Sequence, residues 1–430
     1  MKLKNVLLVS IDAVNTEILF NQNKYNIELK TINKLMSEGS YTRDGNTSVF
    51  PSFTYCAHQS IITGCHPEKH GINTNKLFDP LDKHNDAWYW YVNDRVPTLW
   101  EMAKQNGYYT VNVGFPSSVM APTDLNIPEY WRDTTEFDSE LLSAICTPQG
   151  LSKEFELQKN KKIPCGLWRI EDDETKLEQC LWIIENKLKD KAKDIPLFMT
   201  TYFASYDDIA HNEGTYSKIA LEYLERTDKL LGELIKSLKS KLGENLVVCV
   251  ISDHGMMDNI GDININAEFV RNGLIRTNSA EKILDYKAYC QRSGGAGLVK
   301  LSDDKYFSEV KASLESIQDK IPEKITAIMT GAEAKEKRHS CFDYDFIITT
   351  KPGWEIREDL TGDLIKTTPF QSAQHGYDEN YPDMKAIFII AGCGIPKGVV
   401  EGNSIIDIAP TLANQMGFTM ESSQGRNILE

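Results

Sequence analysis

Five short, nearly uninterrupted apolar segments constrain the fold of this chain more than any other feature of its sequence. They span Asn5–Asp12, Tyr108–Phe115, Ile195–Ala204, Asn245–Asp253 and Lys385–Ala391. Runs of this length are typical of strands that are buried on both faces of a parallel sheet. Segments with helical spacing of apolar residues separate them. This order favours an α/β fold with a doubly wound, mostly parallel sheet and helices on both of its faces.

Glycines mark the ends of two of the helices that we expect between these strands. The segments Thr31–Glu38 and Thr98–Asn106 stop at Gly39 and Gly107. A glycine after a helix commonly takes the left-handed backbone conformation that closes the last turn. We therefore expect both glycines to be left-handed caps. The longest expected helix, Thr215–Leu242, has apolar residues at helical spacing along one face.

Residues 262–372 have strand and helix patterns of their own. These patterns are Gly297–Leu301, Asp303–Ile317, Ile325–Met329 and Asp345–Thr349. A chain of 430 residues exceeds what one small core accommodates. We therefore expect a catalytic core made of residues 1–261 and 373–430, with residues 262–372 inserted as a smaller α/β cap. Residues 120–175 have no regular pattern and are expected to be irregular.

Net charge and cysteine content limit the kinds of partner that we expect the protein to bind and the cellular compartment in which we expect it. The formal net charge is −15, and a protein this acidic repels nucleic-acid polymers and anionic membranes. The amino-terminal apolar segment is short and meets Asp12 at once, so we interpret it as a strand and not as a signal peptide. Nine cysteines without a CxxC spacing are typical of buried thiols in a reducing compartment. We expect a cytoplasmic protein with neither a membrane nor a nucleic-acid polymer as partner.

Residues of the kind that bind metal ions stand at the ends of the strand-like segments. The candidates are Asp12, Asp207, Asp208, His211, Asp253, His254 and His375. Each by itself has an ordinary explanation, because a carboxylate at a strand end can cap the next helix and a lone histidine is usually a satisfied polar residue. Together they indicate zinc, which accepts mixed aspartate and histidine ligands. Two zinc ions can stabilise both the attacking and the leaving oxygen in a displacement at phosphorus.

Thr54 lies where the segment FPSFTYCAHQSIITG changes from an extended to a helical pattern. The amino-terminal end of a helix offers unpaired N–H groups and the positive end of a dipole, which suit a phosphate oxygen. A threonine hydroxyl becomes a nucleophile when a metal ion lowers its pKa. Threonine is also a common helix N-cap. The chemistry of the sequence leaves both interpretations open.

Taken in order, these motifs resemble the alkaline phosphatase superfamily, and most closely its nucleotide pyrophosphatase/phosphodiesterase branch, the type I phosphodiesterases. The resemblance rests on VSIDA, PSFT, the TG, HPE and HGI steps, an Asp-x-x-x-His pair, SDHGM, QHGYD and IDIAPTLANQMG. It runs along most of the chain but covers residues 120–175 and 262–372 poorly. It implies an alkaline phosphatase-like fold for the catalytic core.

The resemblance implies two metal sites and a nucleophile. The implied ligands are Asp207, His211 and His375 for one ion, and Asp12, Asp253 and His254 for the other. Thr54 is the implied nucleophile and reaches the metal ions. The implied cofactor is two Zn²⁺, with Mn²⁺ or another divalent ion as an alternative. The spacing to His211 favours Asp207 over its neighbour Asp208.

Three further residues match positions around the substrate in that branch. Asn75 corresponds to the asparagine that contacts a non-bridging phosphate oxygen. Tyr55 and Tyr202 correspond to aromatic residues of the nucleobase or leaving-group pocket. In this chain Tyr55-Cys56-Ala57 stands where the family often has Phe-Pro-Asn, so the match is weaker at the pocket than at the metal ligands.

The implied activity is hydrolysis of phosphodiester or pyrophosphate bonds through a phosphothreonine intermediate, on a small phosphorylated substrate such as a nucleotide. Phosphonoacetate hydrolases and phosphomonoesterases of the same superfamily are alternatives, and so is a zinc-binding protein without catalytic activity. Monoesterases of this type use an arginine near the phosphate. The arginines closest to Thr54 in the sequence are Arg43 and Arg95. Neither is obviously placed near the nucleophile segment, and this favours a diester substrate. The sequence does not indicate an oligomeric state.

Overall fold

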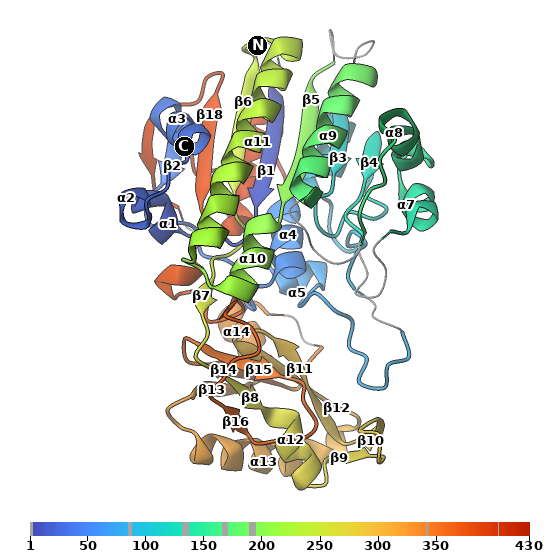
Figure 1. The fold of residues 1–430 in the computed structure, drawn as a ribbon, viewed down its shortest axis with the longest axis vertical. Coiled ribbons are helices and arrows are strands. Elements are labelled where there is room, and N and C mark those ends of the chain that lie inside the picture. The colour runs from blue at the N-terminus through green and yellow to red at the C-terminus, as the bar shows by residue number, and fades with distance from the viewer. Residues whose placement is uncertain are drawn as a thin grey trace.

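The computed structural model describes residues 3–84, 88–130, 137–165, 171–188, 195–340, 343–402 and 404–430. They form a larger body around a central sheet and a smaller body at one end of it (Figure 1). Within these ranges, every helix is too short or too polar to cross a lipid bilayer. Short elements outside the main layers are α1 (Thr16–Phe20), α2 (Gln22–Tyr25), α5 (Pro67–His70), α10 (Ser205–Glu213), β7 (Met257–Asp258), β9 (Ile275–Thr277), β10 (Ile283–Tyr286), β17 (Ala373–Gln374) and the 3-10 turns Asp304–Tyr306, Pro382–Met384 and Ile405–Asp407.

Eight strands form the central sheet of the larger body, in the order β19-β2-β18-β6-β1-β5-β3-β4. Their bounds are β1 (Asn5–Ile11), β2 (Ser40–Thr42), β3 (Tyr109–Val113), β4 (Leu125–Ile127), β5 (Leu197–Phe203), β6 (Leu246–Ile251), β18 (Phe388–Gly392) and β19 (Gly398–Val400). Neighbouring strands are parallel except at β18, which runs antiparallel to both β6 and β2. The expected mostly parallel sheet is confirmed, and the last of the five apolar segments is the strand that runs the other way.

Side chains of β1 alternate between two separate hydrophobic cores. Leu7 and Val9 belong to one core, and Val6 and Leu8 belong to the other. Both faces of the strand are buried, which explains its uninterrupted apolar sequence. The first core includes side chains of α3 (Lys30–Glu38), α9 (Glu171–Asn186) and α11 (Lys218–Leu242), and the second those of α4 (Thr54–Thr63), α6 (Leu99–Gln105) and α15 (Ile408–Met416). Figure 1 shows α9 and α11 in front of the sheet. The doubly wound arrangement is therefore confirmed.

The two glycines that follow α3 and α6 differ in conformation. Gly107 has φ +84°, the left-handed conformation that we expected. Gly39 has φ −140° and ψ −155°, so the expected left-handed cap is wrong there. Gly39 leads directly into β2, and a Cβ atom at this position would lie 2.1 Å from the carbonyl oxygen of Ile390 in β18. Glycine is needed at this point for the close approach of two backbones, and not for helix termination.

Residues 262–372 form most of the smaller body, which we call the cap, around an antiparallel sheet with the order β11-β12-β14-β13. The elements are β11 (Ala288–Ser293), β12 (Ala296–Leu301), β13 (Ile325–Thr330), β14 (Phe346–Thr350), α12 (Ile265–Arg271), α13 (Phe307–Lys320), α14 (Gly331–Arg338) and the small sheet of β15 (Trp354–Arg357), β8 (Gly261–Asn264) and β16 (Ile365–Lys366). Phe269, Val310 and Ile348 are members of a third hydrophobic core, separate from the two cores of the larger body. The boundaries at 262 and 372 stay a prediction.

The segment 120–175 is more regular than its sequence pattern indicates. It contains β4 and the helices α7 (Ser139–Ile145) and α8 (Leu151–Lys159), and α9 begins at Glu171. The two short helices bury only a few side chains each, such as Leu142 and Phe155. So few apolar positions produce no visible helical period. Residues 131–136 and 166–170 of this segment lie outside the described residues.

Candidate active site at the carboxyl ends of the central strands

Three adjacent strands of the central sheet, β6, β1 and β5, end side by side. Asp12 follows β1 directly, and Asp253 comes two residues after β6. Asp207 and His211 lie one turn apart on α10, which follows β5. His375 comes directly after β17. Because ligands bind at the carboxyl ends of strands in such sheets, these side chains stand where a site is expected.

Asp207, His211 and His375 form the first metal group. One ligand atom from each lies within 4.8 Å of the others. Nε2 of His211 is 3.4 Å from Oδ2 of Asp207, and Nε2 of His375 is 4.0 Å from Oδ1 of Asp207. The group contains Asp207 and not Asp208, which agrees with the choice that the spacing favours.

Asp12, Asp253 and His254 form the second metal group, which has the same 4.8 Å limit between ligand atoms. Nε2 of His254 is 3.1 Å from Oδ2 of Asp253 and 3.6 Å from Oδ1 of Asp12. All three side chains are buried. The ring of His254 stacks on the ring of His375 with 3.9 Å between the centroids, so the two metal groups are adjacent.

The three histidines of the metal groups are held in the same way. Nδ1 of each donates a hydrogen bond to a backbone carbonyl. For His211, His254 and His375 the acceptors are Ala373, Gly255 and Ser52, at 2.8, 3.0 and 3.0 Å. A carbonyl oxygen can only accept, so the proton is on Nδ1 and Nε2 keeps its lone pair. Metal-binding histidines are commonly oriented by such a second hydrogen bond.

One oxygen of each carboxylate in the metal groups lacks a hydrogen-bond partner in the described part of the chain. Oδ1 of Asp12, Oδ1 of Asp207 and Oδ2 of Asp253 are buried without a hydrogen-bond partner among the described residues. An unpaired buried carboxylate oxygen is costly in free energy. Burial, together with the charges of Asp253 and Asp207, raises the pKa of Asp12 well above its usual value. A divalent cation at each group would pair with these oxygens, and the aspartate and histidine donors fit zinc.

Thr54 lies at the start of α4, against the second metal group. Phe53 occupies the N-cap position and Thr54 is the first helical residue, so the alternative in which Thr54 is only the N-cap is wrong. Oγ1 of Thr54 is 3.5 Å from Nε2 of His254. The hydroxyl is therefore next to both the candidate ligands and a positive helix end.

Asn75 is oriented by a backbone hydrogen bond beside Thr54. Its Oδ1 accepts the N–H of Tyr55 at 2.9 Å, and Asn75 lines the same cavity as Thr54. With the carbonyl oxygen occupied, the NH₂ group of the amide remains as a donor. Such a donor suits a phosphoryl oxygen.

The two tyrosines expected in the substrate pocket line the cavity, but they are almost completely buried. Tyr55 is 2% exposed and Tyr202 is 1% exposed. The hydroxyl of Tyr202 donates to Oδ2 of Asp12, and the ammonium group of Lys176 lies 4.5 Å from the centre of its ring. This tyrosine therefore supports a candidate metal ligand and leaves little surface for a nucleobase. Trp88, which is half-buried, offers a larger aromatic surface in the cavity.

A cavity of about 300 Å³ contains Thr54 and residues of both metal groups in its wall. Seven other residues of this wall were not among the site candidates from the sequence, namely Phe53, Lys76, Trp88, Glu129, Arg292, Gln371 and Gln374. Lys76 follows Asn75, and Trp88 begins the run Trp88-Tyr89-Trp90-Tyr91. Both residues therefore lie beside a pattern that is visible in the sequence. Arg292 comes from β11 of the cap and has no such pattern beside it. An arginine therefore lines the site although no arginine near Thr54 in the sequence indicated one.

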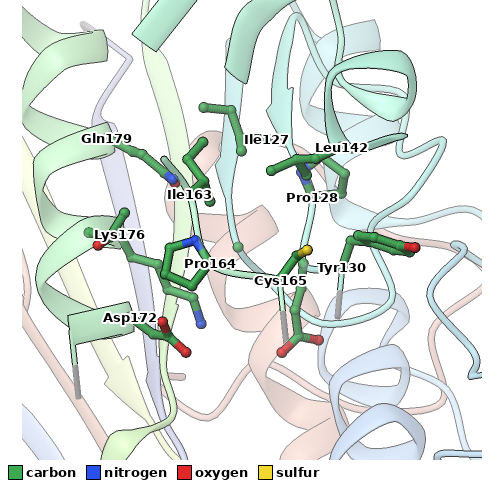
Figure 2. Close-up of a pocket in the computed structure, with 13 residues that line it drawn as sticks. Ile127, Pro128, Tyr130, Leu142, Ile163, Pro164, Cys165, Asp172, Lys176 and Gln179 are labelled. Atoms are coloured by element: carbon green, nitrogen blue, oxygen red, sulfur yellow. The ribbon is translucent and has the colours of Figure 1, made fainter. Parts of the chain in front are cut away.

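A second, smaller pocket adjoins this cavity, and Glu129 lines both. Figure 2 shows Asp172 and Lys176 of α9 on one side of it and Tyr130 on the other. Burial raises the pKa of Glu129 to about 7, although the charge of Lys176 acts in the opposite direction. A carboxyl group that titrates near neutral pH therefore borders the candidate active site.

The comparison with protein families agrees with this geometry. Residues 6–378 match the model of the type I phosphodiesterase / nucleotide pyrophosphatase family, which is well over half of the chain. The chain belongs to this family. The type I phosphodiesterase branch that its motifs resemble is thereby confirmed.

Relatives of this chain differ in how much of their length the chain spans. It is 26% identical over 263 residues to ectonucleotide pyrophosphatase/phosphodiesterase family member 1 of Homo sapiens, which is 58% of this chain and 23% of that protein. The chain thus spans about a quarter of that relative. It is 23% identical over 431 residues to bis(5'-adenosyl)-triphosphatase ENPP4 of Bos taurus, which covers 98% of this chain and 80% of that protein.

Solved structures show the same fold. Murine ectonucleotide pyrophosphatase/phosphodiesterase 5 matches 99% of this chain and 100% of its own length, with a TM-score of 0.69 at 20% identity. The same murine protein has also been solved as an inactive variant in complex with AMP, with the same TM-score. The expected alkaline phosphatase-like α/β fold is confirmed by this match.

Proposed function

We propose that the chain hydrolyses phosphodiester or pyrophosphate bonds of small nucleotide-type substrates, with Thr54 as the nucleophile. One observation carries the proposal: the Thr54 hydroxyl lies at the start of α4, 3.5 Å from Nε2 of His254, which belongs to one of two adjacent groups of metal-type ligands. A hydroxyl in this position can be activated by a cation. Membership of the type I phosphodiesterase family supports the reaction class.

The reaction proceeds through two successive displacements at phosphorus. Cations bound at the two metal groups would supply Lewis acidity and neutralise charge on the phosphoryl group. Oγ1 of Thr54 bonds to phosphorus as the bond to the leaving oxygen breaks, which forms a phosphothreonine and releases the first product. Water then attacks phosphorus, the bond to Oγ1 breaks, and Thr54 regains its proton. The Asn75 amide donates to a non-bridging oxygen in both steps.

A nucleotide substrate is supported by what the names of the relatives state. One is a bis(5'-adenosyl)-triphosphatase and another was solved with AMP. In this chain, Trp88 lines the cavity and contacts Tyr55 edge to face at 5.9 Å between centroids. An aromatic face beside Thr54 suits stacking on a base. Nucleobase binding therefore rests on Trp88 in this proposal.

Zinc is the metal that the donor set supports best. Three aspartates and three histidines make up the two metal groups, and zinc accepts both ligand types in four-coordinate sites. Mn²⁺ also binds carboxylates and imidazoles, and affinity alone rarely separates these ions. Reconstitution of metal-free protein with each ion, followed by activity and metal analysis, tests the choice. Higher activity with Mn²⁺ at equal occupancy would contradict zinc.

A cytoplasmic location is part of the proposal. The eight described cysteines form no disulfide with one another, and seven of them are buried, which supports a reducing compartment. Titration of the denatured protein with a thiol reagent, without reductant, should find all nine cysteines reactive. A value below nine in freshly isolated protein would contradict a reducing compartment.

A phosphomonoesterase is the second candidate, because Arg292 lines the cavity. Monoesterases need a positive charge for the additional negative charge of a monoester. The two candidates differ in the ratio of kcat/KM for bis-p-nitrophenyl phosphate and p-nitrophenyl phosphate. A higher value for the diester is expected. A higher value for the monoester would favour the second candidate, and acetate release from phosphonoacetate would favour a phosphonoacetate hydrolase.

The substitution Thr54→Ala tests the nucleophile. It should lower kcat for bis-p-nitrophenyl phosphate by at least about a thousandfold, because the first displacement loses its attacking oxygen. Metal content per chain should not change. Thr54→Ser keeps a hydroxyl and should retain part of the activity, and Thr63→Ala, at the other end of α4, should retain nearly all of it. Near-normal turnover by Thr54→Ala would disprove the assignment, and absence of EDTA-sensitive turnover in the unmodified protein would favour the non-catalytic alternative.

A further inference from the structure

Arg292 brings a positive charge from the cap into the wall of the active-site cavity. It lies near the end of β11 and lines the cavity together with Gln371, Gln374 and His375. The arginine is therefore close to the first metal group.

The cap holds Arg292 in place through contacts on both sides of it along the chain. On one side, Nε2 of Gln291 donates to the carbonyl of Lys76 at 3.1 Å. On the other side, the N–H of Gly295 donates to the carbonyl of His375 at 3.0 Å. A Cβ atom at Gly294 would lie only 2.0 Å from the same carbonyl oxygen. The strand that carries Arg292 is thus fixed against the segments that carry Asn75 and His375.

The guanidinium group itself is oriented by a buried partner. Nη2 of Arg292 forms an ion pair with Oε1 of Glu355 at 2.5 Å, and Glu355 is completely buried. The same nitrogen donates to Gln371. The Nε atom is buried without a partner among the described residues, and the side chain is 28% exposed. An arginine anchored at one edge presents its other N–H groups as a preformed anion site.

The position of Arg292 relative to Thr54 indicates which part of the substrate it meets. Thr54 lies against His254 of the second metal group. In an in-line displacement the leaving group departs on the side of phosphorus opposite to the attacking oxygen. With the attacking oxygen against the second metal group, the first metal group, next to which Arg292 lies, is the one left to face the leaving group. The leaving group is therefore the part of the substrate closest to the guanidinium.

We propose that Arg292 forms a subsite for an anionic leaving group. The chain would then prefer anhydride substrates, which release phosphate or pyrophosphate groups, to diesters that release an alcohol. A hydrogen bond to a charged group contributes more than one between neutral groups. A cationic leaving group, such as a choline ester, would be disfavoured by the same charge. This inference rests on the proposed phosphodiesterase activity and adds the chemistry of the leaving group.

Two substrates that differ only in the leaving group test the proposal. The leaving group of thymidine 5′-triphosphate is pyrophosphate, which is already anionic in the bound substrate, whereas the nitrophenyl group of p-nitrophenyl thymidine 5′-monophosphate carries no charge until the bond breaks. Arg292→Met should lower kcat/KM at least about tenfold more for the triphosphate than for the ester. Arg292→Lys keeps a charge without the planar fork and should recover part of the preference. Equal losses for both substrates would mean that Arg292 binds the attacked phosphoryl group, and would overturn the proposal, as would no loss.

Arg357→Met is the matched control. Arg357 also contacts Oε1 of Glu355, at 3.3 Å, but it is on β15 and outside the cavity wall. Its substitution should change kcat/KM by the same small factor for both substrates. A selective loss for the triphosphate in this variant would assign the effect to Glu355 and the cap sheet, and would contradict a subsite at Arg292.

A binding measurement separates the subsite from catalysis. In metal-loaded Thr54→Ala protein, calorimetric titration should give tighter binding of thymidine 5′-triphosphate than of the monophosphate. Adding Arg292→Met should remove at least about tenfold of that difference. An unchanged difference would overturn the subsite. If the unmodified, metal-loaded protein hydrolyses neither substrate, the proposed function fails, while the titration still decides whether Arg292 binds the additional phosphates.

Discussion

At several histidines of this chain, one neighbouring backbone group decides which ring nitrogen carries the proton. In the metal groups, a carbonyl accepts from Nδ1 and leaves Nε2 with its lone pair. The order is reversed at His70, where the N–H of Ile72 donates to Nδ1 at 3.2 Å and Nε2 shares a 2.8 Å hydrogen bond with the hydroxyl of Ser60. His70 is 2% exposed. Its ring is therefore neutral, and a proton on Nδ1 would break the bond to Ile72.

The substitution His70→Asn should reduce the loss of stability in acid. Burial lowers the pKa of His70 from 6.5 to about 3. The unfolded chain therefore takes up a proton first as the pH falls, and the folded state loses stability between about pH 6.5 and pH 3. One proton corresponds to about 1.4 kcal/mol per pH unit in this window. Urea unfolding at pH 7 and pH 5 should give a smaller difference for His70→Asn than for the unmodified protein.

Exposed His84 provides the control for this measurement. His84→Asn removes a histidine that lies on the surface and not in a core, and it should keep the pH dependence of the unmodified protein. Parallel pH profiles for His70→Asn and the unmodified protein would show that His70 does not contribute to acid unfolding.

A single glycine can determine how closely two elements pack, and another can determine where a helix ends. Gly39 lies between α3 and β2 and lets the backbone pass close to Ile390 of β18. Gly107 follows α6 with φ +84° and has open space around it. The two positions look alike in the sequence, but the neighbouring strand exists only at Gly39. The element that crowds a glycine, and not the helix before it, decides which substitution is tolerated.

The substitutions Gly39→Ala and Gly107→Ala should differ in cost. At Gly39 the new methyl group would meet Ile390 O at 2.1 Å, so β2 and β18 must separate, and we expect a loss of about 3 kcal/mol in the free energy of unfolding. At Gly107 the cost is the left-handed conformation alone, about 1 kcal/mol. Urea unfolding of both variants at pH 7 measures this difference. Equal losses would contradict the role given to the strand pairing at Gly39.

On the scale of the whole molecule, the active site joins parts that are distant in the sequence. The second metal group is built on β1 and β6, and the first on α10 and the segment after the cap. The cap contributes Arg292 and contacts the His375 backbone through Gly295. In the unfolded chain these side chains are scattered over more than 300 residues. Metal ions bound at both groups therefore stabilise the folded state only.

Removal of metal should lower the thermal stability and the activity together. An ion present at one hundred times its Kd adds about 2.7 kcal/mol at each site. Scanning calorimetry should show a lower midpoint after EDTA and recovery with Zn²⁺. Asp207→Asn should reduce the metal content from two ions to one, whereas Asp208→Asn, next to it on α10, should keep two. An unchanged midpoint after EDTA, or two ions in Asp207→Asn, would contradict the two-metal site.

The sequence by itself determined the class of the fold and the residues of the metal groups. Strands buried on both faces leave uninterrupted apolar runs, and Asp12, Asp253 and His254 follow two of these runs within three residues, so both signals are local. Thr54 and Asn75 also lie within short motifs. The tertiary structure alone decided the reversed direction of β18, the role of Gly39, the contact of Tyr202 with Asp12 and the entry of Arg292 into the cavity. These features depend on which distant segments pack together, and such contacts leave no pattern in the residues next to them.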